Sequence, residues 1–149
     1  MSVSVKDKMT KFVVSVTPRT TVREAWGVLT RIGFRHLPVV ENGALVGMIS
    51  DRDILVYNPN SGGLPDTPVR ECMTTRLVTC ESNVSIRDAA TLMVFHQIDS
   101  LPVMDGKQLI GLITSTDILE LVSEGHGPQD ESLPWKFTVE SIEEKASSL

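Results

Sequence analysis

In the first half of the chain, segments whose apolar residues have the spacing of a β-strand alternate with segments whose apolar residues have the spacing of a helix. A β-rich run covers residues 13–16, as expected for a short strand. Two further apolar runs, 37–40 and 45–49, flank Asn42-Gly43, and this dipeptide between apolar runs predicts a β-hairpin. Ser50, three residues before an acid, indicates the start of a helix after the hairpin. An earlier helix is predicted by apolar residues that share one helical face: Val22, Ala25, Trp26, Leu29 and Ile32.

The same pattern recurs 64 residues later along the chain. Residues 5–55 align with residues 69–119 without a gap, and fifteen of the 51 positions are identical. In the second copy the hairpin turn is Asp105-Gly106, and the last helix begins near Thr114. Because such self-similarity marks a duplicated structural unit, we expect an α+β protein built from two β-α-β-β-α repeats.

The repeat divides the chain into four segments: repeat 1 (5–57), a linker (58–68), repeat 2 (69–122) and a C-terminal tail (123–149). Three prolines and two glycines in the linker disfavour a helix or a central strand there. The tail is polar and acidic, with an aromatic island at Trp135 and Phe137. One repeat is too small to cover its sheet on both sides, so the two repeats are expected to pack around a shared core.

The net charge of −5 comes from one end of the chain. Residues 1–119 hold twelve acids and twelve bases, whereas residues 120–149 hold seven acids and two bases. A neutral body with an acidic tail argues against binding to nucleic acid, which requires a basic face. No apolar run approaches the roughly 18 residues of a membrane span, and no secretory signal is visible. We therefore expect a cytoplasmic protein without membrane association.

The sequence shows no pattern typical of catalysis. Neither a Ser-His-Asp arrangement nor a phosphate loop is visible, and Cys72 and Cys80 have no partner pair at zinc-ligand spacing. An enzyme, a metal site and a required cofactor are therefore not expected.

The motifs shared by the two copies resemble the cystathionine-β-synthase (CBS) domain, and the chain resembles a stand-alone tandem pair, or Bateman module. The resemblance is carried by Leu-Pro-Val, by the glycine of the second hairpin strand and by the Asp-Ile-Leu of the last helix, in order and at constant spacing. In the first copy these are residues 37–39, Gly47 and residues 53–55; in the second they are residues 101–103, Gly111 and residues 117–119.

The resemblance implies a regulatory or sensor function. Similar pairs bind AMP, ADP, ATP, S-adenosylmethionine or NAD-type ligands in clefts between their repeats, and they regulate another domain or protein. Similar modules also pair through exposed helices, which implies a homodimer. The alternative is a dimerisation or protein-interaction module that binds no small ligand.

In similar proteins, the Asp of a Ser/Thr-x-x-Asp pattern holds the ribose hydroxyls. This implies one cleft at Ser50 and Asp53 and a second cleft at Thr114 and Asp117. The chemistry is reasonable because a carboxylate accepts two hydrogen bonds from a vicinal diol. The alternative is that these residues only cap their helices. Arg52, next to Asp53, is placed to reach either phosphate or solvent.

The residues before Leu-Pro-Val approach the ligand's phosphates in similar proteins, each in the cleft of the other repeat. Arg35 and His36 would then face the Asp117 cleft, and Asp99 and Ser100 would face the Asp53 cleft. Since a carboxylate near phosphate is unfavourable, we expect a phosphate-bearing ligand to prefer the Asp117 cleft, unless Arg52 reverses this preference.

The resemblance also implies where the adenine lies. Residues 17–20, with Thr17 and Thr20, would frame the adenine slot of the Asp117 cleft, and residues 81–84 would frame the other. Pro38 is also expected among the ligand-binding residues.

Overall fold

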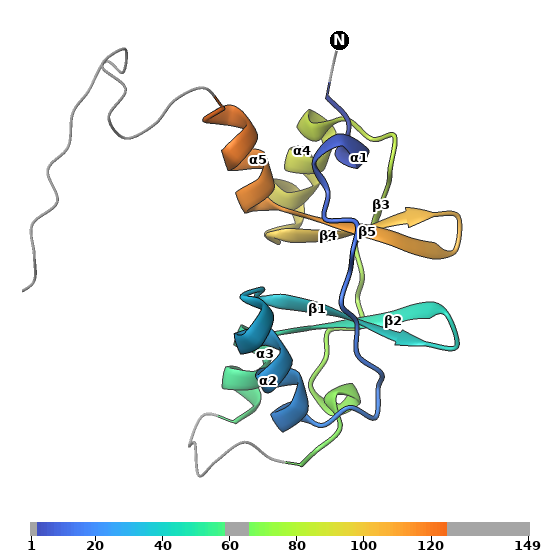
Figure 1. The fold of residues 1–149 in the computed structure, drawn as a ribbon, viewed down its shortest axis with the longest axis vertical. Coiled ribbons are helices and arrows are strands. Elements are labelled where there is room, and N and C mark those ends of the chain that lie inside the picture. The colour runs from blue at the N-terminus through green and yellow to red at the C-terminus, as the bar shows by residue number, and fades with distance from the viewer. Residues whose placement is uncertain (1–2, 59–65, 125–149) are drawn as a thin grey trace, which may run out of the picture.

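The computed structural model describes residues 3–58 and 66–124, and it has two similar halves (Figure 1). The halves contain α1 (Val5–Lys8), α2 (Val22–Ile32), β1 (His36–Glu41), β2 (Ala44–Ser50), α3 (Asp51–Tyr57), the 3-10 helix η1 (Val69–Glu71), β3 (Cys80–Glu81), α4 (Ile86–His96), β4 (Ser100–Asp105), β5 (Gln108–Thr114) and α5 (Ser115–Val122). The tail with Trp135 and Phe137, and residues 59–65 of the linker, lie outside the described residues.

Two β-hairpins meet in the middle of the molecule, and the helices lie on their outer sides (Figure 1). Strands β1 and β2 pair antiparallel, as do β4 and β5, with equivalent registers and an irregularity at the same place in each hairpin. The first turn uses left-handed backbone at Asn42 (φ 51°) and Gly43 (φ 80°), as an Asn-Gly turn favours. Both predicted hairpins are confirmed.

The predicted first strand of each repeat is shorter than the sequence indicates. In repeat 1 it is reduced to Val16, which forms a single parallel bridge with Val39. In repeat 2 it is β3, which pairs parallel with β4 at Cys80 and Glu81. The run at 13–16 is therefore mostly irregular, because Val16 alone reaches the hairpin in register.

The first segment of each repeat is exchanged between the halves, because it pairs with the hairpin of the other repeat. Thr10 pairs with Leu112 of β5 through two backbone hydrogen bonds of 2.9 and 3.0 Å. Thr74 pairs in the same way with Met48 of β2, at 2.8 and 2.9 Å. Each sheet therefore gains an edge from the segment that the sequence repeat assigns to the other half.

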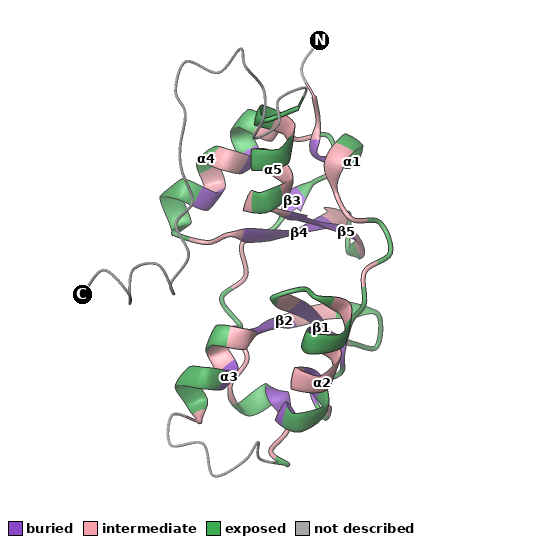
Figure 2. Cartoon of the chain, turned by 60° about the vertical axis from the view of Figure 1, so that its left-hand side comes forward, coloured by how far each residue is buried: buried purple, intermediate pink, exposed green. Residues whose placement is uncertain are grey.

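The buried apolar side chains form two clusters among the described residues, not the single core expected from the sequence. One cluster combines α2, β1 and β2 with Val69 of η1. The other combines α4, β4 and β5 with Val5 of α1. Figure 2 shows the buried residues on the strands and on the helix faces turned towards them. Each cluster thus includes a residue from the first segment of the other repeat.

Within residues 3–58 and 66–124, no helix has both the length and the apolar character needed to cross a membrane.

Candidate functional site

The Ser/Thr-x-x-Asp motifs form capping boxes at the start of α3 and α5. The backbone N–H of Thr114 donates to Oδ2 of Asp117 at 2.8 Å, and the Thr114 hydroxyl donates to the same oxygen at 3.0 Å. In the other repeat the N–H of Ser50 donates to Oδ2 of Asp53 at 3.0 Å. Capping therefore uses one carboxylate oxygen of each Asp. Among the described residues, Oδ1 of Asp117 has no recorded hydrogen-bond donor, so this oxygen can accept from a ligand.

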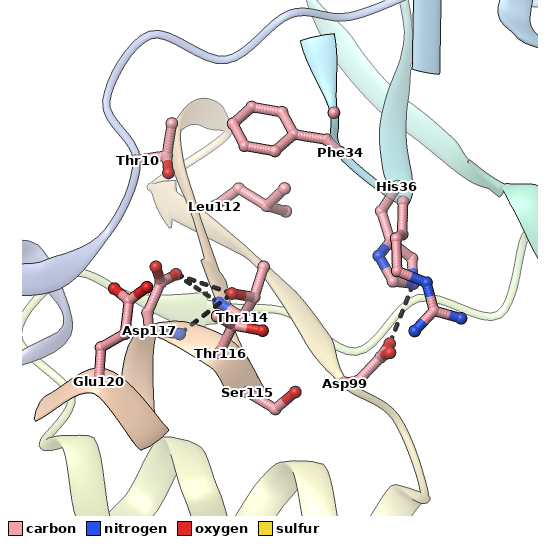
Figure 3. Close-up of a pocket in the computed structure, with 12 residues that line it drawn as sticks. Thr10, Phe34, His36, Asp99, Leu112, Thr114, Ser115, Thr116, Asp117 and Glu120 are labelled. Atoms are coloured by element: carbon pink, nitrogen blue, oxygen red, sulfur yellow. Dashed lines mark hydrogen bonds and ion pairs between the residues drawn. The ribbon is translucent and has the colours of Figure 1, made fainter. Parts of the chain in front are cut away.

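The Asp117 cleft lies between the two halves and has a volume of about 330 Å³. Repeat 2 contributes Thr114 and Asp117, and repeat 1 contributes His36 at the start of β1 (Figure 3). Arg35, the residue before β1, also lines the cleft. The structure brings these four residues, which the sequence analysis assigns to one cleft, to the lining of the same cleft. The other lining residues are Thr10, Gly33, Phe34, Asp99, Leu112, Ser115, Thr116 and Glu120.

One wall of this cleft is apolar and the opposite end is acidic. Figure 3 shows the ring of Phe34 and the side chain of Leu112 on one side, with Asp117 and Glu120 next to each other on the other. The Phe34 side chain leaves 43% of its surface exposed, so its ring is available for stacking. A cleft with an aromatic wall and a few polar groups is typical of sites for small ligands.

The Asp53 cleft has a volume of about 280 Å³ and is lined by residues from both halves. It contains Ser50, Arg52 and Asp53 from repeat 1, together with Asp99 and Ser100 from repeat 2. These are the residues that the sequence analysis assigns to this cleft. The remaining lining residues are His36, Met48, Thr74, Arg76, Leu77, Val78, Gln97, Ile98 and Pro102.

The two clefts are related by the internal repeat. Most residues that line one have their 64-residue counterpart in the other, such as Thr10 and Thr74 or Phe34 and Ile98. The exchanged segments supply the two threonines, and each cleft combines four stretches of chain. The clefts therefore share a backbone frame and differ in side-chain chemistry.

A contact between a histidine and a carboxylate lies between the clefts. Nε2 of His36 is 2.9 Å from Oδ1 of Asp99, and both residues line both clefts. The neighbouring Arg35 pairs with Asp51, with Nε and Oδ2 3.3 Å apart. Both basic side chains that the sequence analysis assigns to the Asp117 cleft are therefore already in contact with carboxylates.

Three predicted ligand-binding residues do not line either cleft. Thr17 and Thr20 bind each other, since the N–H of Thr17 donates to Oγ1 of Thr20 at 3.1 Å. The carbonyl of Thr20 also accepts from Val69 of the exchanged segment. Pro38 is fully buried in β1. The stretch 17–20 is thus engaged with η1, away from the linings of both clefts.

The equivalent stretch of repeat 2, residues 81–84, is engaged in the same way. The carbonyls of Ser82 and Val84 accept from Lys6 and Val5 of α1. The structure therefore does not bring this stretch to the Asp53 cleft, for the same reason that residues 17–20 do not reach the other.

Arg76, Phe34 and Glu120 line the clefts although sequence reasoning missed them. A signal for Arg76 exists in the repeat alignment, where its counterpart is Phe12. An arginine in one repeat at the position of a phenylalanine in the other, two residues after Thr74, marks a place where the clefts differ. Among the described residues, no group of three or more His, Cys, Asp or Glu side chains is placed to hold a metal ion. The side chains that line the clefts offer hydrogen bonds, charge and an aromatic surface.

The family model of the CBS domain matches the chain twice, over residues 5–59 and 69–124. The chain belongs to the CBS domain family. The CBS domain-containing protein YhcV of Bacillus subtilis (strain 168) is 42% identical over 115 residues, which cover 77% of this chain and 82% of that protein. The tandem CBS pair expected from the repeat is confirmed.

Solved structures share the fold. The CBS domain pair of protein MJ0100, solved in complex with 5′-methylthioadenosine and S-adenosyl-L-methionine, gives a TM-score of 0.75 at 26% identity. That similarity covers 83% of this chain and 98% of the other. The inosine-5′-monophosphate dehydrogenase of Methanocaldococcus jannaschii is 35% identical over 112 residues, but these cover only 22% of that enzyme. The CBS repeats are thus also found within a larger enzyme.

Proposed function

We propose that this CBS pair is a regulatory module that binds an adenosine-containing ligand in the clefts between its repeats. The observation that carries the proposal is the pair of inter-repeat clefts, each with an Asp whose capping role uses one carboxylate oxygen. The structural similarity to a CBS pair bound to two adenosyl compounds supports the same ligand class. AMP, ADP, ATP, S-adenosylmethionine and NAD all share the adenosine group.

The parts of adenosine match the chemistry of the Asp117 cleft. The free Oδ1 of Asp117 suits a ribose hydroxyl, since a charged acceptor makes a strong hydrogen bond. The ring of Phe34 and the side chain of Leu112 offer an apolar surface for the adenine. The capping and ligand-binding roles of Asp117 are compatible, because they use different oxygens of the carboxylate.

Calorimetry and thermal unfolding test this function. Adenosine, 5′-methylthioadenosine, S-adenosylmethionine, AMP, ATP and NAD are each titrated into the full chain. A ligand at about 100 times its dissociation constant should stabilise the fold by about 2.7 kcal/mol. If no compound in this panel releases heat or shifts the unfolding midpoint, the proposed function is wrong.

Variants of the two Asp residues connect binding to the clefts. Asp117→Asn and Asp53→Asn should each remove binding at one cleft. Glu24→Gln is the matched control, because the Glu24 carboxylate accepts from the backbone N–H of Thr21 in the capping box of α2, yet Glu24 lines neither cleft. A loss of binding in the control as large as in Asp117→Asn would mean that helix capping explains the effect.

A second candidate function is dimerisation or partner binding. It is favoured by large apolar side chains on the outer helices: Val94 and Phe95 of α4 are 80% and 79% exposed, and Leu119 and Val122 of α5 are 67% and 76% exposed. We propose that this surface pairs two copies of the chain in a homodimer and that ligand occupancy is passed on to a regulated protein. A dimer whose stability no adenosyl compound changes would favour the ligand-free function.

A further inference from the structure

The charged side chains around the two clefts are distributed differently from the expectation based on sequence. The Asp53 cleft is lined by two arginines, Arg52 and Arg76, and by two aspartates, Asp53 and Asp99. The Asp117 cleft is lined by one arginine and by three carboxylates: Asp99, Asp117 and Glu120. His36 lines both clefts and does not distinguish them.

The availability of the cations strengthens this difference. Within residues 3–58 and 66–124, no carboxylate partner is recorded for Arg52 or Arg76. Arg35 is paired with Asp51 at 3.3 Å, and this pair would have to be weakened before Arg35 could bind another anion. Because Arg35 is 68% exposed, solvent screens this pair, and weakening it costs little. The local excess of carboxylates therefore disfavours an anion in the Asp117 cleft more than the Arg35 pair does.

Asp99 lines both clefts, so the acid that distinguishes them is Glu120, which lines the Asp117 cleft and not the Asp53 cleft. Asp99 contacts His36 at 2.9 Å, so its carboxylate faces a hydrogen-bond donor. Glu120 has no such recorded partner among the described residues, and it lies next to Asp117 at the end of the other cleft (Figure 3). Two neighbouring carboxylates repel a phosphate and attract a cation.

From these charges we propose that the two clefts separate ligands by charge. The Asp53 cleft binds the phosphate-bearing adenosine ligand, and Arg76 is the residue that determines this specificity. The Asp117 cleft binds an adenosine ligand without phosphate, either neutral or positively charged at its 5′ end. This inference rests on the proposed function, because it assumes that both clefts hold adenosine.

Arg76 suits this role through both its chemistry and its place. A guanidinium group binds phosphate through a planar pair of N–H donors. The residue follows the exchanged segment, two positions after Thr74, which itself lines the cleft next to Asp53. The repeat counterpart of Arg76 is Phe12, which is 92% exposed and lines neither cleft. The positive charge of Arg76 is thus present in the Asp53 cleft, and no equivalent charge comes from the counterpart position, Phe12.

Calorimetry with ATP and adenosine tests the separation on the full chain. Arg76→Gln should weaken ATP binding by about tenfold or more, the loss expected for a hydrogen bond to a charged group, and leave adenosine binding within about twofold. Arg35→Gln should change ATP binding less than Arg76→Gln does. Arg31→Gln is the matched control, since Arg31 is an exposed arginine of α2 that lines neither cleft.

The possible results distinguish this inference from the proposed function. If wild-type protein binds neither adenosine nor ATP, both are wrong. If adenosine binds, but Arg76→Gln leaves the ratio of ATP to adenosine affinity unchanged, only the separation by charge is wrong. It is also wrong if Arg35→Gln reduces ATP binding more than Arg76→Gln, or if Arg31→Gln reduces it equally.

Discussion

Gly47 of β2 lies directly against Met73: a Cβ atom added to the glycine would be 2.6 Å from Sδ of Met73 and 3.2 Å from the carbonyl oxygen of Thr74. The repeat counterpart Gly111 has the same relationship to Met9 and Thr10. The glycines therefore allow the exchanged segments to approach the hairpins closely enough to pair with them. A glycine in a strand often marks such an approach of another backbone.

Replacement of Gly47 by alanine should destabilise the fold. Overpacking of this kind costs about 1–3 kcal/mol, because the carbonyl of Thr74 belongs to paired backbone and cannot move freely. Denaturant unfolding of Gly47→Ala measures the loss. Gly27→Ala is the control: Gly27 lies within α2 with no atom near the added methyl, so this variant should gain roughly 0.5–1 kcal/mol. Equal stability of the two variants would contradict the role of the close approach.

The repeated frame could be predicted from the sequence because it depends on local signals. Hairpin turns such as Asn42-Gly43 and caps such as Thr114 act within a few residues, and the 64-residue repeat reveals them twice. The expectation that Asp117 shares a cleft with Arg35 and His36 followed from the family resemblance, and all three residues line one cleft of the structure.

The exchange of segments could not be predicted in the same way. The alignment assigns Met73 to the repeat that follows it, whereas packing against Gly47 joins it to the repeat before. Residues 17–20, the predicted adenine slot, do not line the Asp117 cleft for a related reason. Thr17 and Thr20 lie beside η1, which the exchange of segments brings next to them. Likewise, the Asp51 partner of Arg35 is sixteen residues away in sequence, and no local pattern indicates it.

The two cysteines should react slowly in the folded protein. Burial raises the pKa of the Cys72 thiol, and the charges of Asp53 and Glu71 raise it further. Burial and the charge of Glu81 raise the pKa of Cys80. Because the thiolate is the reactive form, a disulfide reagent at mildly alkaline pH should modify the folded chain much more slowly than the chain in guanidinium. Equal rates in the two states would contradict this prediction.

The raised pKa values of the two thiols also determine how the stability of the fold changes with pH. A thiol whose pKa is higher in the folded state favours folding less as the pH rises through that pKa. The free energy of unfolding should therefore fall at alkaline pH, and Cys72→Ser should reduce the decline. Cys80, which is 6% exposed, should be the slower of the two to react.

The ribose hydroxyls should contribute measurably to binding. If Oδ1 of Asp117 accepts from a 2′-hydroxyl, 2′-deoxyadenosine should bind more weakly than adenosine by about 1–3 kcal/mol, the cost of a lost hydrogen bond to a charged group. Calorimetry compares the two ligands without altering the protein. The matched control is 5′-deoxyadenosine, which keeps the diol and should retain its affinity. Equal affinities for adenosine and its 2′-deoxy form would mean that the Asp does not hold the ribose.

The exposed apolar surface of α4 and α5 should hold two copies of the chain together. Phe95 is 79% exposed beside Val94 at 80%, and pairing would remove this apolar area from water. Light scattering at micromolar concentration should give twice the mass of the chain. Phe95→Glu should give the monomer mass, because a carboxylate buried in an apolar interface lacks a partner. Phe12→Glu changes a phenylalanine that is 92% exposed and lies outside these helices, and this variant should remain dimeric. A monomeric wild type, or dissociation by both variants alike, would exclude this surface as the dimer interface.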